Sequence, residues 1–181
     1  MNQPDHSPGP RVLVVEDDAV VALLYKSMLG QAGYQIQHCG DGATALRTLS
    51  QEKFDAVILD LMMPQVDGIQ VLKGMRASVE NALTPVIIVT TARLQVVQEE
   101  AMRYGAKLFL DKTQIDRVAG ALREILAERV ALGPDKLRLA PLAPIGNKAL
   151  HHKTMPSPVP IAPQESPEPK GLARLFRRRD T

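Results

Sequence analysis

Apolar and polar positions alternate along residues 11–132 in two recurring patterns. Short continuous apolar runs are typical of strands buried on both faces of a parallel sheet, and apolar residues three or four positions apart are typical of helices. The strand pattern occurs at residues 11–15, 34–39, 55–60, 86–90 and 107–110. The helix pattern occurs at residues 19–32, 42–51, 67–77, 94–104 and 114–131. Five strand–helix units in strict alternation predict an α/β fold, a parallel sheet with helices on both faces.

The first predicted helix carries apolar residues at helical spacing, namely Val20, Leu23, Leu24, Met28 and Leu29. Gly33 follows this helix, and glycine commonly ends helices because it adopts the left-handed conformation without strain. Asp41 precedes the second predicted helix and is a suitable N-cap residue. These flanking residues support the predicted bounds.

Two of the predicted strands end in acidic residues. The apolar run 56–59 leads into Asp60, and Pro64 soon afterwards blocks further strand pairing. The run 11–15 leads into three acids at positions 16–18. Open α/β sheets bind ligands at the carboxyl ends of their strands. A single Asp after a strand is most often a turn residue, but two acidic strand ends predict a carboxylate cluster at one edge of the sheet.

Other strand ends carry matching polar residues. Glu16 and Asp17 follow the first strand, Asp60 opens the pattern D-x-x-M-P-x-x-D-G after the third, Thr90 ends the fourth, and Lys112 follows the fifth. In this order, the residues resemble the receiver domain of response regulators in bacterial two-component signalling, over residues 11–132. The resemblance implies a flavodoxin-like (βα)5 doubly wound fold with strand order 2-1-3-4-5.

The predicted carboxylate cluster calls for a cation. Two like charges about 4 Å apart repel by about 4 kcal/mol at an effective dielectric constant of 20, and oxygen ligands suit Mg²⁺. The resemblance implies that Asp17, Asp60 and the backbone carbonyl of Met62 bind Mg²⁺ directly and that Glu16 acts through water. It also implies that Asp60 attacks the phosphorus of a phosphohistidine and becomes an aspartyl phosphate.

Three further roles follow from the resemblance. Lys112 would pair with the phosphoryl group, and the Thr90 hydroxyl would donate a hydrogen bond to it. Phe109 would then move into the space that Thr90 vacates and change the surface of the fourth helix, fifth strand and fifth helix. The alternatives are a solvated loop lysine, a strand-end threonine and an ordinary core phenylalanine.

One position departs from the family pattern. The receiver family usually has proline after the lysine, often with a cis peptide bond, and this chain has Thr113. A cis bond before a residue other than proline costs about 3 kcal/mol, so we expect a trans bond here. Thr113 and Asp116 together resemble a helix capping box.

The chain changes character after residue 132. Residues 133–169 hold nine of the fourteen prolines and predict a disordered linker. Within 170–181, basic residues surround three apolar ones at helical spacing, Leu172, Leu175 and Phe176. This pattern suggests a segment that docks in a partner's groove or on an anionic membrane surface, and a solvated chain end is the alternative. Residues 1–10 are expected to be a flexible N-terminus.

Charge and cysteine content narrow the class of protein. Nine Lys or Arg and four Asp or Glu follow residue 132, so that segment has a net charge of +5. Because the whole chain has a net charge of +2, residues 1–132 carry −3. The basic character therefore does not indicate a globular domain that binds DNA directly. A single cysteine, Cys39, and the absence of a long apolar run or signal-peptide pattern favour a cytoplasmic protein.

These observations predict a single-domain response regulator. We expect Asp60 to accept a phosphoryl group from a sensor histidine kinase or a phosphotransfer protein, with no enzymatic activity beyond self-phosphorylation and self-dephosphorylation. The output would be a phosphorylation-dependent protein–protein interaction. Alternatives are a phosphorelay intermediate, a regulator of a separate DNA-binding protein, or a Mg²⁺-dependent aspartyl-phosphate hydrolase. The hydrolase is disfavoured because such enzymes carry D-x-D on the first strand, whereas here the acceptor follows the third.

Overall fold

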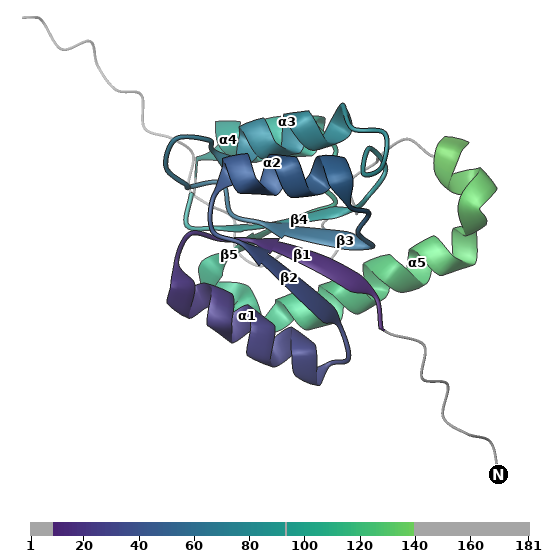
Figure 1. The fold of residues 1–181 in the computed structure, drawn as a ribbon, viewed down its shortest axis with the longest axis horizontal. Coiled ribbons are helices and arrows are strands. Elements are labelled where there is room, and N and C mark those ends of the chain that lie inside the picture. The colour runs from purple at the N-terminus through teal and green to yellow at the C-terminus, as the bar shows by residue number, and fades with distance from the viewer. Residues whose placement is uncertain (1–8, 93, 140–181) are drawn as a thin grey trace, which may run out of the picture. The chain divides into compact units, whose positions relative to one another are not determined.

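The structure is a computed structural model that describes residues 9–92 and 94–139, and these residues form five strand–helix units (Figure 1). The strands are β1 (Arg11–Val15), β2 (Gln35–Cys39), β3 (Ala56–Leu59), β4 (Val86–Thr90) and β5 (Leu108–Asp111). All paired strands run parallel, in the order β2-β1-β3-β4-β5. This order confirms the predicted doubly wound sheet.

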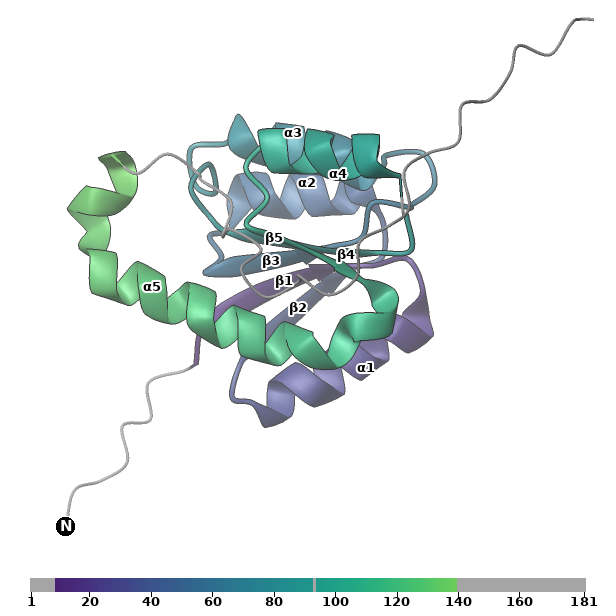
Figure 2. The ribbon, with the colours of Figure 1, turned by 180° about the vertical axis from the view of Figure 1, so that it is seen from behind.

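Helices cover both faces of the sheet. They are α1 (Ala19–Gln31), α2 (Gly42–Gln51), α3 (Gly68–Arg76), α4 (Gln95–Arg103), the 3-10 helix η1 (Lys112–Arg117) and α5 (Val118–Leu139). Figure 1 shows α2, α3 and α4 on one face and α1 with α5 on the other, and Figure 2 shows the same two layers from behind. No helix in the described ranges is both long enough and apolar enough to cross a membrane.

The core consists of two layers because side chains alternate along each strand. Val12 and Val14 of β1 belong to the layer beneath α1 and α5, whereas Leu13 and Val15 belong to the layer beneath α2, α3 and α4. Ile58 of β3 follows the same alternation and belongs to the α1/α5 layer. Every residue of β3 is buried, as its continuous apolar sequence predicts for a central parallel strand.

Helix α1 packs on a different side from the one its apolar pattern indicates. Its buried residues are Ala22, Tyr25 and Leu29, while Val20, Leu23 and Leu24 are exposed by 77%, 66% and 48%. Of the five apolar positions singled out from the spacing, Leu29 is buried in the core and Met28 packs against it partly buried, whereas the other three are exposed. Apolar residues occur on nearly all sides of this helix, so helical spacing alone did not determine which side faces the sheet.

Short polar side chains fix the starts of three helices. Asp18, Asp41 and Asp67 are the N-caps of α1, α2 and α3, and each accepts a backbone N–H from the first turn. Asp41 accepts the Thr44 N–H at 2.7 Å, which confirms the predicted cap. Gly33, directly beyond α1, has φ +89°, a conformation that suits glycine.

The segment after β5 differs from its prediction. The N-cap is Asp111, which accepts the Thr113 N–H at 2.9 Å, and the Gln114 side chain accepts the Asp111 N–H at 3.4 Å. The predicted capping box of Thr113 and Asp116 is therefore wrong. Strand β5 ends one residue later than predicted, so the aspartate next to Lys112 takes the cap position and Thr113 falls in the first turn. The peptide bond before Thr113 is trans, as expected.

Helix α5 is interrupted near the predicted domain boundary. Gly133 has φ 68° and ψ 164°, which is not helical, and helical residues resume after it as far as Leu139. The helix was expected to stop before Gly133, whereas the described chain is helical for six residues beyond it. Most of the predicted linker and the whole of residues 170–181, including Leu172, Leu175 and Phe176, lie outside the described residues.

Candidate functional site

Three carboxylates meet at the carboxyl ends of β1 and β3. Glu16, Asp17 and Asp60 each place an oxygen within 4.8 Å of the others. The two strands are neighbours, and the Asp60 N–H donates to the Val15 carbonyl at 3.0 Å. The sheet itself therefore brings the acids together, and the predicted carboxylate cluster is present.

The three carboxylates differ in burial. Glu16 is 1% exposed and Asp60 is 3% exposed, while Asp17 is open to solvent. Burial raises the pKa of Glu16, although the hydrogen bond and charge of Lys112 oppose the shift. Buried carboxylates are stable only with cations or hydrogen-bond donors beside them.

Lys112 supplies a cation to both buried carboxylates. Its Nζ lies 2.7 Å from Oε1 of Glu16 and 2.7 Å from Oδ2 of Asp60. Burial by itself would lower the pKa of Lys112, but the hydrogen bonds and charges of Asp60 and Glu16 outweigh it, so the pKa is raised. The lysine side chain is 19% exposed. It is therefore part of the site and not a solvated loop lysine.

The donor set fits a hard divalent cation. Three carboxylates with a single lysine among them leave an excess of negative charge, and all their donor atoms are oxygens, as Mg²⁺ prefers. The Met62 N–H donates to Oδ1 of Asp60 at 3.0 Å, so the Met62 peptide is held in the same turn as the acceptor. Glu16, Asp17, Asp60 and the Met62 carbonyl are the residues that would hold such an ion.

Thr90 and Phe109 lie on neighbouring strands below this edge. Thr90 is fully buried at the end of β4, and its hydroxyl accepts the Ala92 N–H at 3.3 Å. Phe109 of β5 pairs with Ile88, two residues before Thr90, and packs partly buried against the α2/α3/α4 layer. Residues 88 and 90 share a face of the sheet. The two proposed switch residues are thus placed on the same side of adjacent strands.

Two residues that support the site were not singled out from the sequence. The His38 Nε2 lies 2.8 Å from the Glu16 carbonyl oxygen, which ties the acidic loop to β2. A Cβ on Gly68 would lie 2.7 Å from Leu61 Cα, so only glycine fits at the start of α3. Gly68 is the last residue of the D-x-x-M-P-x-x-D-G motif. Its close approach to the loop after Asp60 depends on tertiary packing, so the motif alone does not predict it.

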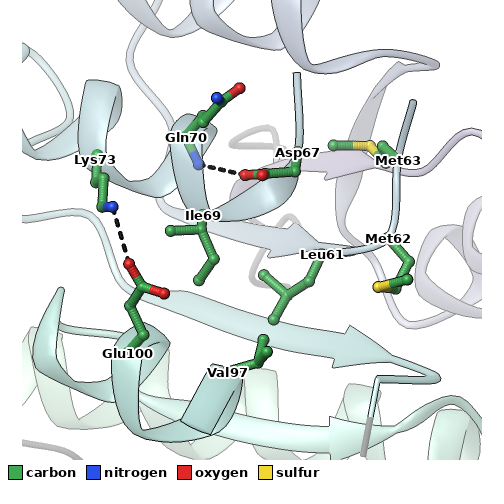
Figure 3. A pocket seen from close by; sticks show the side chains of 9 residues that line it. All are labelled: Leu61, Met62, Met63, Asp67, Ile69, Gln70, Lys73, Val97 and Glu100. Atoms are coloured by element: carbon green, nitrogen blue, oxygen red, sulfur yellow. Dashed lines mark hydrogen bonds and ion pairs between the residues drawn. The ribbon is translucent and has the colours of Figure 1, made fainter. Parts of the chain in front are cut away.

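A shallow groove lies beside the loop that follows Asp60. It lies between α3 and α4, and Leu61, Ile69 and Val97 are among the residues that line it (Figure 3). The Lys73 Nζ donates to Oε1 of Glu100 at 2.9 Å and links the two helices across it (Figure 3). Met62 lines the groove and is 61% exposed.

Comparison with known proteins gives one consistent answer. Residues 12–123 match the sequence model of the family described as response regulator receiver domain. A transcriptional activator protein PfeR of Pseudomonas aeruginosa is 32% identical over 133 residues, which are 74% of this chain and 42% of that protein. A response regulator MprA of Mycolicibacterium vanbaalenii is 36% identical over 123 residues, which are 67% of this chain and 49% of that protein. The chain thus spans about half the length of these relatives or less.

Solved structures agree with the sequence match. A Francisella response regulator receiver domain superposes with a TM-score of 0.61 at 30% identity, over 66% of this chain and 98% of that one. The receiver domain of a Pseudomonas aeruginosa sensor histidine kinase superposes with a TM-score of 0.58 at 27% identity, over 66% of this chain and 98% of that one. That second structure holds a magnesium ion in its active-site cleft.

Proposed function

The chain belongs to the response regulator receiver family, and from that premise we propose that Asp60 accepts a phosphoryl group from a phosphohistidine of a sensor histidine kinase or phosphotransfer protein. The observation that carries this proposal is the arrangement around Asp60. Lys112 pairs with both Asp60 and Glu16, which are buried, and Asp17 completes the acidic edge.

The surroundings of Asp60 suit phosphoryl transfer. The Met62 N–H donates to Oδ1 and Lys112 donates to Oδ2, so the carboxylate is held in one orientation. An Asp60 oxygen forms the new bond to phosphorus, the phosphorus–nitrogen bond of the donor breaks, and the imidazole leaves with the bonding electrons. Lys112 then pairs with the doubly charged phosphoryl group. When bound, Mg²⁺ offsets the charge of the carboxylates and of the phosphoryl oxygens.

The chain exposes an apolar surface next to Asp60 that suits the docking of a phosphodonor protein. Helix α1 begins directly after the acidic loop and exposes Val20, Leu23 and Leu24. A donor histidine that reaches Asp60 brings its own protein over this apolar side of α1. We expect Leu23→Asp to slow transfer from a protein donor while uptake from acetyl phosphate is unchanged, and equal slowing with both donors would contradict this docking surface.

Output is proposed to depend on the surface of α4, β5 and α5. The Thr90 hydroxyl moves toward the phosphoryl group, and Phe109 follows into the vacated space, which changes that surface. Leu94, just before α4, and Val96 are 70% and 75% exposed and offer apolar contacts to an output protein. The output is then a phosphorylation-dependent interaction with another protein.

The chain itself is proposed to act as a receiver without direct DNA binding. The alternatives are a phosphorelay intermediate or a regulator of a separate DNA-binding protein, and one relative is named as a transcriptional activator. Enzymatic activity beyond its own phosphorylation and dephosphorylation is not proposed. Leu172, Leu175 and Phe176 remain candidates for docking in a partner's groove or on an anionic membrane.

Labelling tests the proposal directly. The wild-type chain, incubated with acetyl phosphate or a phosphorylated cognate kinase, should take up label only when Mg²⁺ is present. Asp60→Asn should take up none, because it removes the carboxylate that Lys112 and the Met62 N–H hold in one orientation beside the acidic edge. If Asp60→Asn is labelled like the wild type, the assignment of the acceptor is wrong.

A further inference from the structure

Tyr25 carries an unexplained polar atom in the core. Its side chain is 1% exposed, and among the side chains of residues 9–92 and 94–133 its hydroxyl is the one buried oxygen or nitrogen that has no hydrogen-bond partner. Buried polar groups are almost always hydrogen-bonded, and each exception calls for a physical explanation. Phenylalanine would fill the same space without the cost of an unpaired hydroxyl.

Tyr25 belongs to the core layer on the side of the sheet that faces α1 and α5. Tyr25 projects from α1 into the same core layer as Val14, Ile58 and Leu110. Val14, Ile58 and Leu110 lie on β1, β3 and β5. Glu16, Asp60 and Lys112 lie two residues further along these three segments, so the alternation of side chains places them on the same side of the sheet, at its carboxyl end. Helix α1 starts at this edge, and helical side chains lean toward the N-terminus of their helix.

Electrostatics agree with this placement. Burial, and after it the negative charges of Glu16 and Asp60, raise the pKa of the Tyr25 hydroxyl. The hydroxyl is therefore protonated at neutral pH and is available only as a donor or a neutral acceptor.

Glu16 depends on a donor that it shares. Its carboxylate accepts Lys112 Nζ at 2.7 Å and the Asp18 N–H at 3.2 Å. Lys112 is bonded to Asp60 at the same time. A phosphoryl group on Asp60 brings about two further negative charges and competes for that ammonium group. Glu16 is 1% exposed and would then keep the Asp18 N–H as its donor within the chain, beside any Mg²⁺ that the acidic edge holds, so a further donor would stabilise it.

We propose that the Tyr25 hydroxyl is this reserve donor: it hydrogen-bonds to the Glu16 carboxylate when Lys112 turns to the phosphoryl group on Asp60. Tyr25 is then a positioning residue that favours the phosphorylated state. In the unphosphorylated protein, the unpaired hydroxyl slightly destabilises the fold. The inference rests on the proposed phosphorylation of Asp60.

The test compares Tyr25→Phe with a matched control, Tyr34→Phe. Tyr34 packs against the same core layer, but it follows the far end of α1 at the opposite edge of the sheet. Beryllium fluoride with Mg²⁺ serves as the phosphoryl mimic in a titration. We expect Tyr25→Phe to weaken binding of the mimic about fivefold, the effect of one hydrogen bond, and Tyr34→Phe to bind like the wild type.

Two further measurements make the result specific. Without the mimic, Tyr25→Phe should unfold at the same temperature as the wild type or a higher one, because no hydrogen bond is lost. The chain has three tyrosines, so NMR of ring-labelled tyrosine gives few signals, and the one missing from Tyr25→Phe belongs to Tyr25. Its signal should shift when the mimic is added.

The outcomes separate the two proposals. If wild type binds the mimic and Tyr25→Phe binds it equally well, the role of Tyr25 is wrong and the function of Asp60 stands. A lower unfolding temperature for unliganded Tyr25→Phe, with no lower temperature for Tyr34→Phe, would also overturn it, since the hydroxyl would already be bonded at rest. If the wild type binds no mimic and takes up no label, the proposed function fails and the role of Tyr25 fails with it.

Discussion

Substitution of Gly68 by alanine should damage both the stability and the function of the domain. Gly68 is the first residue of α3, and a Cβ there would lie 2.7 Å from Leu61 Cα and closer still to the carbonyl oxygen of Asp60. Backbone atoms cannot give way as a flexible side chain can. The loop that holds the acceptor must therefore move to admit the methyl group.

Two opposing effects set the size of the change. Alanine is favoured over glycine within a helix by up to about 1 kcal/mol. Overpacking a close contact typically costs 1–3 kcal/mol, roughly, and here the contact is with the backbone. We expect Gly68→Ala to lose about 1–2 kcal/mol of unfolding free energy net, which lowers the unfolding temperature by about 4–8 °C.

Gly120 provides the matched control. It is an exposed residue of α5, and a Cβ there would meet no atom within 4 Å. Gly120→Ala should therefore gain about 0.5–1 kcal/mol from helix propensity alone. Thermal unfolding of both variants, followed by circular dichroism, should give shifts of opposite sign.

Function should separate the two variants as well. Gly68→Ala displaces the Asp60 backbone and should weaken binding of beryllium fluoride at least tenfold, by roughly the 1.4 kcal/mol that a tenfold change represents. Gly120→Ala should bind like the wild type. A Gly68→Ala protein that is as stable as Gly120→Ala, or that binds the mimic normally, would refute the argument that this contact positions Asp60.

Three further predictions concern the switch, a buried arginine and pH. Thr90→Ala should leave labelling of Asp60 largely intact but reduce the mimic-dependent change in hydrogen exchange at α4 and β5; equal changes in mutant and wild type would contradict the relay. The Arg76 guanidinium donates to four loop carbonyls, and although burial lowers its pKa to about 10, it stays charged at neutral pH. Arg76→Ala should therefore lower the unfolding free energy by about 2–4 kcal/mol in urea titrations. Arg76→Lys should lose less of the unfolding free energy. The Thr44 backbone N–H and hydroxyl hold the pKa of Asp41 below its ordinary value of 3.8, so this group stabilises the fold above that value and ceases to do so as the pH falls through the lowered pKa. The difference in urea midpoint between wild type and Asp41→Asn should shrink as the pH falls from 3.8 through the lowered pKa. A constant difference would show that the charge of Asp41 does not contribute to stability.

Much of the fold could be predicted because the strands and helices depend on local sequence, while the strand order came from the family resemblance. Buried parallel strands are continuous apolar runs, and strict alternation with helices leaves few topologies. The acids and the lysine were found for the same reason, since each follows directly from a strand end. Glu16, Asp60 and Lys112 needed only the strand order to come together.

Features that depend on tertiary packing were not predictable in the same way. Helix α1 has apolar residues on nearly every side, and the sheet selects Ala22, Tyr25 and Leu29. One extra residue in β5 moved the helix cap to Asp111. The unpaired hydroxyl of Tyr25 has no counterpart in any sequence pattern, because it results from the depth at which the ring is buried.

Phosphorylation of Asp60 can be tested by locating the acyl phosphate along the chain. After incubation with acetyl phosphate and Mg²⁺, borohydride reduces an aspartyl phosphate to homoserine and leaves free carboxylates intact, so peptide mass spectrometry can locate it. We expect homoserine in place of Asp60 and at no other aspartate, and none at any position when Mg²⁺ is removed. Homoserine at Asp17 or at another aspartate, with Asp60 unchanged, would contradict it.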